Sequence, residues 1–376
     1  MRVARTVFRA LGLSALAFAT GCWSTVPIGH RALVQIVTVD PGRHGETRYA
    51  FIIPTPGELA QTTGSSGSGG SNAQVQAIAV MAPSLALAFT HAESLLSRDL
   101  YLGQAQQILL SEKLSPRVLN DTLNTLVQIP ELDQSQMLFA VKGEAVKAAE
   151  GPDPQEVFPA AFLEHIDSCA TCADVRLRSN LMTTFLKSRA VYAGFALPEV
   201  IPSPYGPTVR GTAFYGTGGK YVLSLGAEDS ALYGLALGRT EKVGLDVPVQ
   251  GLGLVHLRAI KARPAVRVRE VHGQVVARAR LSATGTVVGI EPNRGLPFSR
   301  THAAIETAAA RLIEGRVAGI LAKLLGHGLD PMYLGERLYS ADPARVPRGF
   351  DLATAMKHAR VDLMVHVKLT QNGEVR

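Results

Sequence analysis

The chain has little cysteine and, beyond its first residues, no long apolar run. Only Cys22, Cys169 and Cys172 occur among 376 residues. After Cys22, no uninterrupted apolar stretch approaches the roughly 18 residues that a membrane-spanning helix needs, so we expect a mature chain without such a helix. Hydrophobic residues make up 47% and charged residues 18%, which is typical of globular domains and argues against global disorder.

Motifs of the common catalytic sites are missing as well. The ten histidines form no H-E-x-x-H pair, and the sequence contains no G-x-S-x-G elbow. The Gly251-Leu-Gly253 segment lacks the third glycine and the βαβ context of a dinucleotide site. We therefore predict that the chain is not an enzyme, with no catalytic residues and no cofactor.

The first 22 residues have the pattern of a lipoprotein signal. Three arginines precede an apolar run from Ala10 to about Thr20. As a helix, eleven residues span roughly 16 Å, well short of the roughly 30 Å hydrocarbon core, so this run is a signal peptide and not a permanent span. Small residues lead directly into Cys22, whose thiol would carry the lipid. We predict a signal peptide at 1–21 and a lipid anchor on Cys22, facing outside the cytoplasm; the alternative is ordinary secretion.

The charge balance is mildly basic. The formal charge is +7, and removal of the signal with Arg2, Arg5 and Arg9 lowers it to about +4. Such an excess favours an anionic membrane surface or an acidic partner. Because the chain is expected to be exported, we predict that it does not bind nucleic acid.

Two composition breaks divide the chain. One is a Gly/Ser-rich loop, and the other has four prolines in ten residues, which should interrupt helices and central strands. We predict an α+β, multi-domain fold: three mixed α/β units with antiparallel or mixed sheets packed by helices. The predicted segments are an N-terminal α+β domain at 22–197 with a flexible loop at 64–72, a Pro-rich linker at 198–207, a small second domain at 208–248, and a C-terminal α+β domain at 249–376 with a long helix at 301–325.

Local patterns place the elements within these units. Ser115-Pro116 is a strong helix start, and Ser84 could cap another helix. Gly216–Gly219 predicts a hairpin turn. Alternation predicts strands at about 32–39, 49–54, 75–81, 107–111, 137–141, 208–215, 220–225, 266–271, 275–281 and 361–369, and helical spacing predicts helices at about 84–96, 154–165 and 174–187.

Cys169 and Cys172 form a lone C-x-x-C pair, with His165 four residues upstream. Three interpretations stay open: a local disulfide or inert thiols, thiol exchange, and a metal site. A thioredoxin-like site would need a preceding strand, and zinc would need a fourth ligand that the neighbourhood lacks. We therefore favour the disulfide or inert thiols and predict no metal site.

Basic residues accumulate on the predicted hairpin near residue 270. Arg267 and Arg269 alternate with valines, and Arg278 and Arg280 share one side of the return strand. A solvated sheet face explains this pattern, and so does a surface that docks to anionic lipid head groups or to an acidic subunit. These four arginines are the candidate docking residues.

Taken in order along the chain, several segments resemble the C-subunit lipoproteins of spore germinant receptors, the Ger(x)C family. The resemblance covers nearly the whole mature chain. Its segments are Thr20-Gly-Cys-Trp23, Leu33–Val37, Leu100–Gln104, Ile108–Glu112, Val127–Glu131, Val141–Gly143, Gly211–Phe214, Tyr221–Leu225, Asp330, Leu334-Gly335, Val365–Leu369 and Asn372-Gly373.

The resemblance implies a fold of three α+β domains along an elongated body. It also implies a non-enzymatic, lipid-anchored subunit on the outer surface of the spore inner membrane, beside multi-spanning A- and B-type subunits. In this family those partners bind the germinants, so no direct small-molecule ligand is expected here. Two alternatives are a solute-binding lipoprotein of an uptake system, which the β-rich second half disfavours, and a thiol-active exported protein using Cys169 and Cys172.

Overall fold

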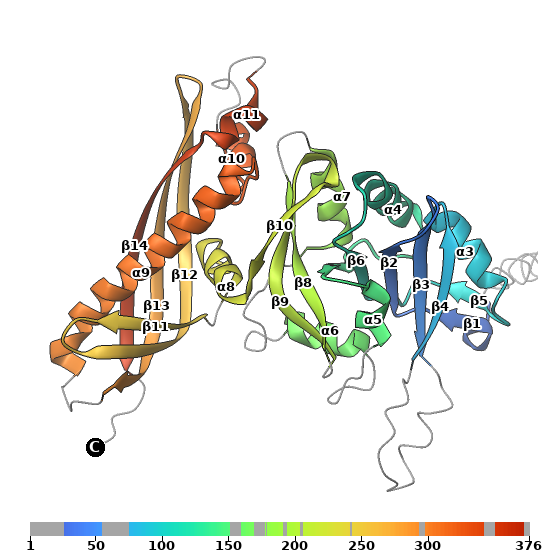
Figure 1. Cartoon of the computed structure of the whole chain (residues 1–376), viewed down its shortest axis with the longest axis horizontal. Helices are drawn as coiled ribbons and strands as arrows, with labels where there is room; N and C mark the ends of the chain where they lie inside the picture. The colour runs from blue at the N-terminus through green and yellow to red at the C-terminus, as the bar shows by residue number, and fades with distance from the viewer. Residues whose placement is uncertain are drawn as a thin grey trace, which may run out of the picture.

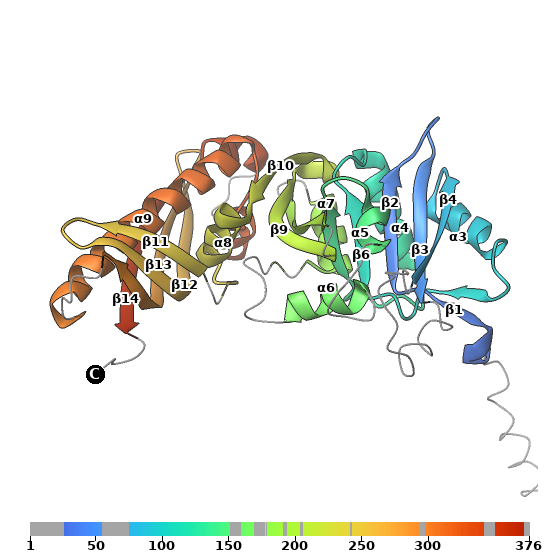
Figure 2. The ribbon, with the colours of Figure 1, turned by 60° about the horizontal axis from the view of Figure 1, so that its bottom comes forward.

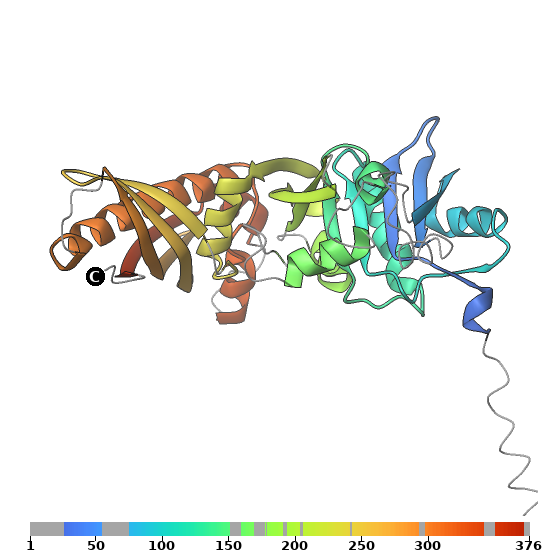
Figure 3. The ribbon, with the colours of Figure 1, turned by 90° about the horizontal axis from the view of Figure 1, so that it is seen from below.

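The structure is a computed structural model that describes residues 26–54, 75–150, 159–168, 177, 179–190, 194–203, 206–240, 243–292, 298–341 and 350–371. These residues form an elongated body with a large sheet at one end and a four-stranded sheet at the other (Figures 1, 2 and 3). The predicted signal peptide, Cys22, the loop at 64–72, Cys169 and Cys172 lie outside the described residues.

The large sheet has eight strands in the order β10-β9-β8-β7-β6-β2-β3-β4. Its centre, from β2 to β8, is parallel, and both flanks are antiparallel. The strands are β2 (Ile36–Pro41), β3 (Thr47–Pro54), β4 (Val75–Ala82), β6 (Gln107–Ser111), β7 (Met137–Val141), β8 (Phe195–Ser203), β9 (Gly206–Tyr215) and β10 (Tyr221–Gly226). A second, two-stranded sheet pairs β1 (Arg31–Leu33) with β5 (Asp99–Tyr101), and the short helix η1 (Ile28–His30) precedes it.

Helices cover both faces of the large sheet. One face packs against α3 (Leu85–Glu93), α4 (Pro116–Gln128) and α7 (Leu181–Arg189), and the other against α5 (Ala145–Glu150) and α6 (Pro159–Ser168). All five residues of β6 are buried, as expected for a strand covered on both sides.

The helix start predicted at Ser115-Pro116 is confirmed. The Ser115 side chain accepts a hydrogen bond from the Val118 amide at 3.3 Å, and Pro116 occupies the first turn of α4. Leu119 and Leu123 of α4 are buried at the helical spacing that the sequence predicts. Local signals therefore fix where this helix begins and which face it buries.

The predicted Pro-rich linker at 198–207 is wrong for the residues that the structure describes, because 198–203 belong to β8 and 206–207 to β9 inside the large sheet. β8 pairs with β7 over two residues only, and the Val200 carbonyl accepts a hydrogen bond from the Lys142 amide at 3.0 Å. Alternate residues of a strand point to the same neighbour, so Pro198 and Pro202 turn their missing amides toward β7, just outside this short pairing. Pro198 and Pro202 therefore remove no hydrogen bond between β7 and β8.

The four-stranded sheet has the order β11-β12-β13-β14. β12 and β13 form the predicted hairpin, which turns at Gly273, and β14 runs parallel to β13. One face of this sheet packs on the long helix α9. The elements are β11 (Val243–Val249), β12 (Gly253–Val271), β13 (Gln274–Glu291), β14 (Arg360–Gln371), α9 (Phe298–Gly326), α10 (Leu334–Ala341) and α11 (Leu352–Lys357).

Residues 208–248 do not form the separate small domain that the sequence predicts. β9 and β10, joined through the turn η2 (Thr217–Gly219), complete the large sheet. Helix α8 (Ala227–Ala236) and β11 instead join the core of the C-terminal unit. The α+β, multi-domain class is confirmed, with mixed and antiparallel sheets covered by helices.

Candidate functional site

The candidate docking arginines lie on the face of the four-stranded sheet that α9 does not cover. The α9 side of β13 buries Val275, Ala277, Ala279 and Leu281, and the arginines that alternate with the last three are exposed. Arg278 and Arg280 are therefore exposed on the outer face.

The pairing of strands brings arginines from both arms of the hairpin together. Arg267 of β12 lies directly opposite Arg278 of β13, and Arg280 is next to Met364 of β14. We define the basic face as a set of eight exposed cations on this outer surface, without the exposed Arg258, which lines a different pocket. The eight are Lys261, Arg263, Arg267, Arg269, Arg278, Arg280, Arg360 and Lys368.

Few acids balance these cations. Arg360 forms an ion pair with Asp362 at 2.9 Å, from Nε to Oδ1. Among the residues that the structure describes, no other member of the basic face has an ion-pair partner. The sheet therefore presents a net positive surface to the solvent.

The basic face is also hollowed. One hollow of about 590 Å³ is lined by residues that include Arg267, Arg278, Arg280 and Met364. A second, of about 500 Å³, is lined by Lys261, Lys368 and the threonines between them. The outer surface thus has space for anionic groups beside its cations.

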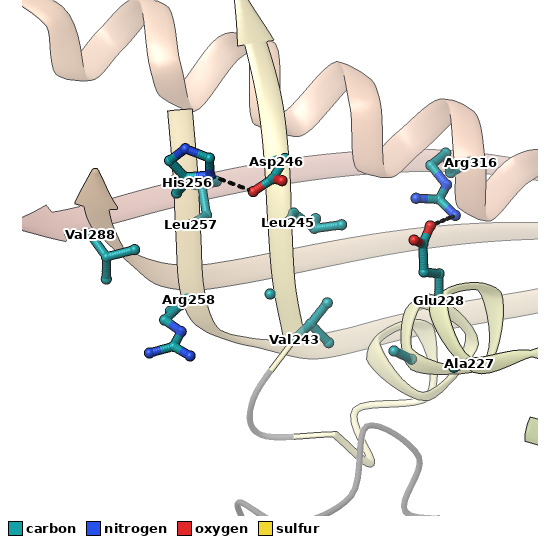
Figure 4. A pocket seen from close by; sticks show the side chains of 12 residues that line it. Ala227, Glu228, Val243, Leu245, Asp246, His256, Leu257, Arg258, Val288 and Arg316 are labelled. Atoms are coloured by element: carbon teal, nitrogen blue, oxygen red, sulfur yellow. Dashed lines mark hydrogen bonds and ion pairs between the residues drawn. The ribbon is translucent and has the colours of Figure 1, made fainter. Parts of the chain in front are cut away.

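A separate pocket of about 480 Å³ lies where β11 and β12 meet α8 and α9 (Figure 4). His256 Nδ1 lies 2.7 Å from Asp246 Oδ1 across the two strands. This hydrogen bond is the main reason why the pKa of His256 is raised above its usual value. On the opposite wall, Arg316 of α9 contacts Glu228 at 3.2 Å and Asp229 at 2.9 Å.

The charged groups of this pocket connect neighbouring elements of the C-terminal unit. The His256–Asp246 pair joins β11 to β12, and Arg316 joins α9 to the first turn of α8. Among the described residues that line the pocket, none is a serine, threonine or cysteine that could act as a nucleophile. The sequence analysis does not predict this pair. A prediction would require the pairing of β11 with β12, which places Asp246 opposite His256.

Two carboxylates, the half-buried Asp330 and the buried Asp40, lie at helix starts. Asp330 accepts hydrogen bonds from the amides of Leu334 and Gly335, at 2.7 and 2.8 Å, at the start of α10. Burial raises the pKa of Asp330. These three residues belong to a segment that resembles the receptor family, and the contacts give it a structural role. Asp40 serves α5 in the same way, and no sequence pattern pointed to it.

The remaining candidates of the sequence analysis are not brought into a site. Cys22, Cys169 and Cys172 lie outside the described residues, and His165 lies on α6. Within the described ranges, no group of three or more His, Cys, Asp or Glu side chains has an arrangement suited to a metal ion. None of the helices in those ranges combines the length and hydrophobicity of a membrane span.

Comparisons with known proteins agree with this architecture. The family model of the spore germination protein N-terminal domain matches residues 24–177, and that of the spore germination B3/GerAC-like C-terminal domain matches residues 210–373. The two matches cover most of the chain, so it is a spore germination protein by family. It belongs to the GerAC, or Ger(x)C, family.

A solved structure, the crystal structure of the GerBC protein, has the same fold. The TM-score is 0.58 at 14% sequence identity, over 89% of this chain and 96% of GerBC. A search of curated proteins found no match.

Proposed function

We propose that this chain is the lipid-anchored, non-enzymatic C subunit of a spore germinant receptor, required when nutrients trigger germination. In this role it lies on the outer surface of the spore inner membrane, beside multi-spanning A- and B-type subunits that bind the germinant. It binds no small molecule itself.

The observation that carries the proposal is the ordered match of two germination-family models over residues 24–177 and 210–373. The fold shared with GerBC supports it. A solute-binding lipoprotein would instead present two α/β lobes with a cleft between them. Here the second half of the described chain is a four-stranded sheet with helices on one face.

The genetic test is deletion of the gene in its spore-forming host, followed by germination on a panel of nutrients. The proposal predicts that germination slows or stops on at least one nutrient, while spore yield is unchanged. It would be contradicted by deletion spores that germinate like the parent on every nutrient, in a strain that carries no second receptor.

The proposed anchor is the thiol of Cys22, which follows the apolar signal segment. Two acyl chains suffice for stable anchoring, because each buried CH₂ contributes about 0.8 kcal/mol. Cells grown with radiolabelled fatty acid should label the chain, and Cys22→Ala should abolish both the label and its lipid-dependent membrane fractionation. A Cys22→Ala chain that still takes up label would contradict the assignment.

Cys169 and Cys172 are proposed as a local disulfide or a pair of inert thiols. Thiol titration of the purified protein, with and without reductant, separates the alternatives. Two thiols that appear only after reduction indicate the disulfide. A thiol that reacts unusually fast at neutral pH would favour the thiol-active alternative instead.

A further inference from the structure

The basic face holds like charges together at a cost in stability. Arg267 and Arg278 are direct cross-strand neighbours, and like charges in that position destabilise a sheet. A merely solvated face is better served by mixed charges. The arrangement therefore points to an anionic group that completes the site.

The same surface exposes apolar side chains among its cations. Met364 is 54% exposed, directly beside Arg280 in the neighbouring strand and within the larger hollow. Ala265 of β12 is also exposed and lines the same hollow. Cations that surround exposed apolar side chains suit the interface of a bilayer, where the charges meet phosphates and the apolar groups enter the head-group layer.

The edge of the sheet argues against a polypeptide strand as the occupant. β11 pairs with β12 only as far as Ile260, so among the described strands none pairs with the outer edge of β12 from Lys261 to Val271. That edge carries Pro264, which lacks an amide donor, and a row of charged side chains. Both features oppose the addition of a strand.

We propose that the basic face is a second membrane-docking site, which binds the phosphate groups of anionic phospholipids. The planar guanidinium groups of Arg267 and Arg278 match the geometry of a phosphodiester in the larger hollow, where both can donate hydrogen bonds. Met364 packs into the head-group layer beside them. The inference rests on the proposed membrane location, but it does not require the lipid on Cys22.

The position of the face gives this contact a consequence for orientation. The four-stranded sheet lies at the opposite end of the body from β1, near which the described chain begins (Figures 1 and 2). An anchor before β1 and a contact at the basic face would hold both ends at the membrane. The long axis of the subunit would then lie along the bilayer.

The test uses the chain from Trp23 to Arg376, which keeps every described residue and carries no lipid. Its binding is measured on vesicles of phosphatidylcholine with about 30% phosphatidylglycerol and on vesicles of phosphatidylcholine alone. We expect binding to the anionic vesicles that weakens with salt, and at least about tenfold weaker binding for the double variant R267E/R278E. A matched control, R43E/R117E, makes the same change in net charge at exposed arginines of the other unit and should stay within about twofold of the parent.

A single variant separates lost docking from lost folding. R278E places a carboxylate opposite Arg267, so the chain should melt at or above the parent temperature and yet bind anionic vesicles more weakly. Equal binding by the parent and R267E/R278E would overturn the proposal, and so would equal losses in R267E/R278E and R43E/R117E. Binding to a polyglutamate peptide without binding to vesicles would also overturn it, because the face would then be a site for acidic protein. Failure of the Cys22 labelling test leaves this experiment unaffected, so the two proposals fail separately.

Discussion

The carboxylate of Glu314 on α9 accepts a hydrogen bond at 3.1 Å from the backbone amide of Val365 on β14. About two turns earlier on the helix, Glu306 accepts a hydrogen bond from the amide of Leu369 at 2.9 Å. Among the described strands, β14 pairs with β13 alone and forms an edge of the four-stranded sheet, and these amides face away from β13. Two helix side chains thus occupy backbone donors that a foreign strand could otherwise use.

Removing both carboxylates should open that edge. The double variant E306A/E314A is expected to lose about 3–6 kcal/mol of unfolding free energy, because two hydrogen bonds to charged groups are removed and each contributes about 1.5–3 kcal/mol. Urea unfolding measures the loss, and light scattering should show increased self-association. Lys323→Ala on the exposed side of α9 serves as the control. Unchanged stability in E306A/E314A would show that the contacts do not protect the edge.

Gly211 is required by close packing between β9 and its neighbours. A Cβ at this position would lie 2.7 Å from the Leu225 carbonyl oxygen and 2.8 Å from Glu199 Oε2, both shorter than side chains tolerate. Gly211→Ala should therefore destabilise the protein by about 1–3 kcal/mol. Gly216→Ala is the matched control, because its Cβ would meet Val222 Cγ2 at an ordinary 3.4 Å. Thermal melts in which both variants match the parent would contradict this account.

Asp40 joins the end of β2 to the start of α5. Its two carboxylate oxygens accept hydrogen bonds from the amides of Ala145 and Val146, at 2.6 and 3.0 Å, in a buried position. Asp40→Ala leaves two buried donors unpaired and should cost about 2–4 kcal/mol of unfolding free energy. Asp121→Ala, at an exposed site on α4, should change it by less than about 0.5 kcal/mol. An equal effect of the two substitutions would refute the capping role.

His256 should make stability depend on pH. Its hydrogen bond to Asp246 raises its pKa in the folded protein above the unfolded value near 6.5. The stabilisation is therefore fully present below the unfolded pKa and is lost as the pH rises through the folded pKa. Melting temperatures of the parent and of His256→Gln between about pH 5.5 and 8.5 test this. The difference in melting temperature between the two proteins should be largest at the acidic end. Asp246→Asn should show most of the change seen in His256→Gln, because only the weaker contact of His256 with Glu291, at 3.5 Å, remains. A difference in melting temperature that widens toward alkaline pH would contradict the raised pKa of His256.

Local signals predicted much of this fold. Ser115 and Pro116 begin α4, Gly273 turns the long hairpin, and the alternation of Arg267 and Arg269 with valines sets the arginines on the exposed face of β12. Each of these features depends on residues close together in the sequence. Local backbone preferences and the spacing of apolar side chains determine these features without contacts from distant parts of the chain.

Long-range contacts decided the rest. The prolines of β8 predict an interruption of the strand. In the structure, β8 pairs with β7 over two residues only, so no backbone amide is required at Pro198 and Pro202. The sequence pattern does not predict helix α8. Its residues from Ser230 to Ala236 are all buried, so apolar and polar positions do not alternate with the helical period. Glu306 and Glu314 contact residues of β14 that lie more than 50 positions away in the sequence. Local sequence patterns do not predict contacts over such a separation.

We propose that the chain acts in nutrient-triggered germination as a membrane-anchored receptor subunit. The most direct test of this proposal is complementation of the deletion strain, followed through the loss of absorbance of spores on the nutrient that the deletion affects. The account predicts that the parent gene restores the rate and that Cys22→Ala, at equal protein level, does not. An unchanged rate of deletion spores on every nutrient, in a strain that carries no second receptor, or full rescue by Cys22→Ala would contradict it.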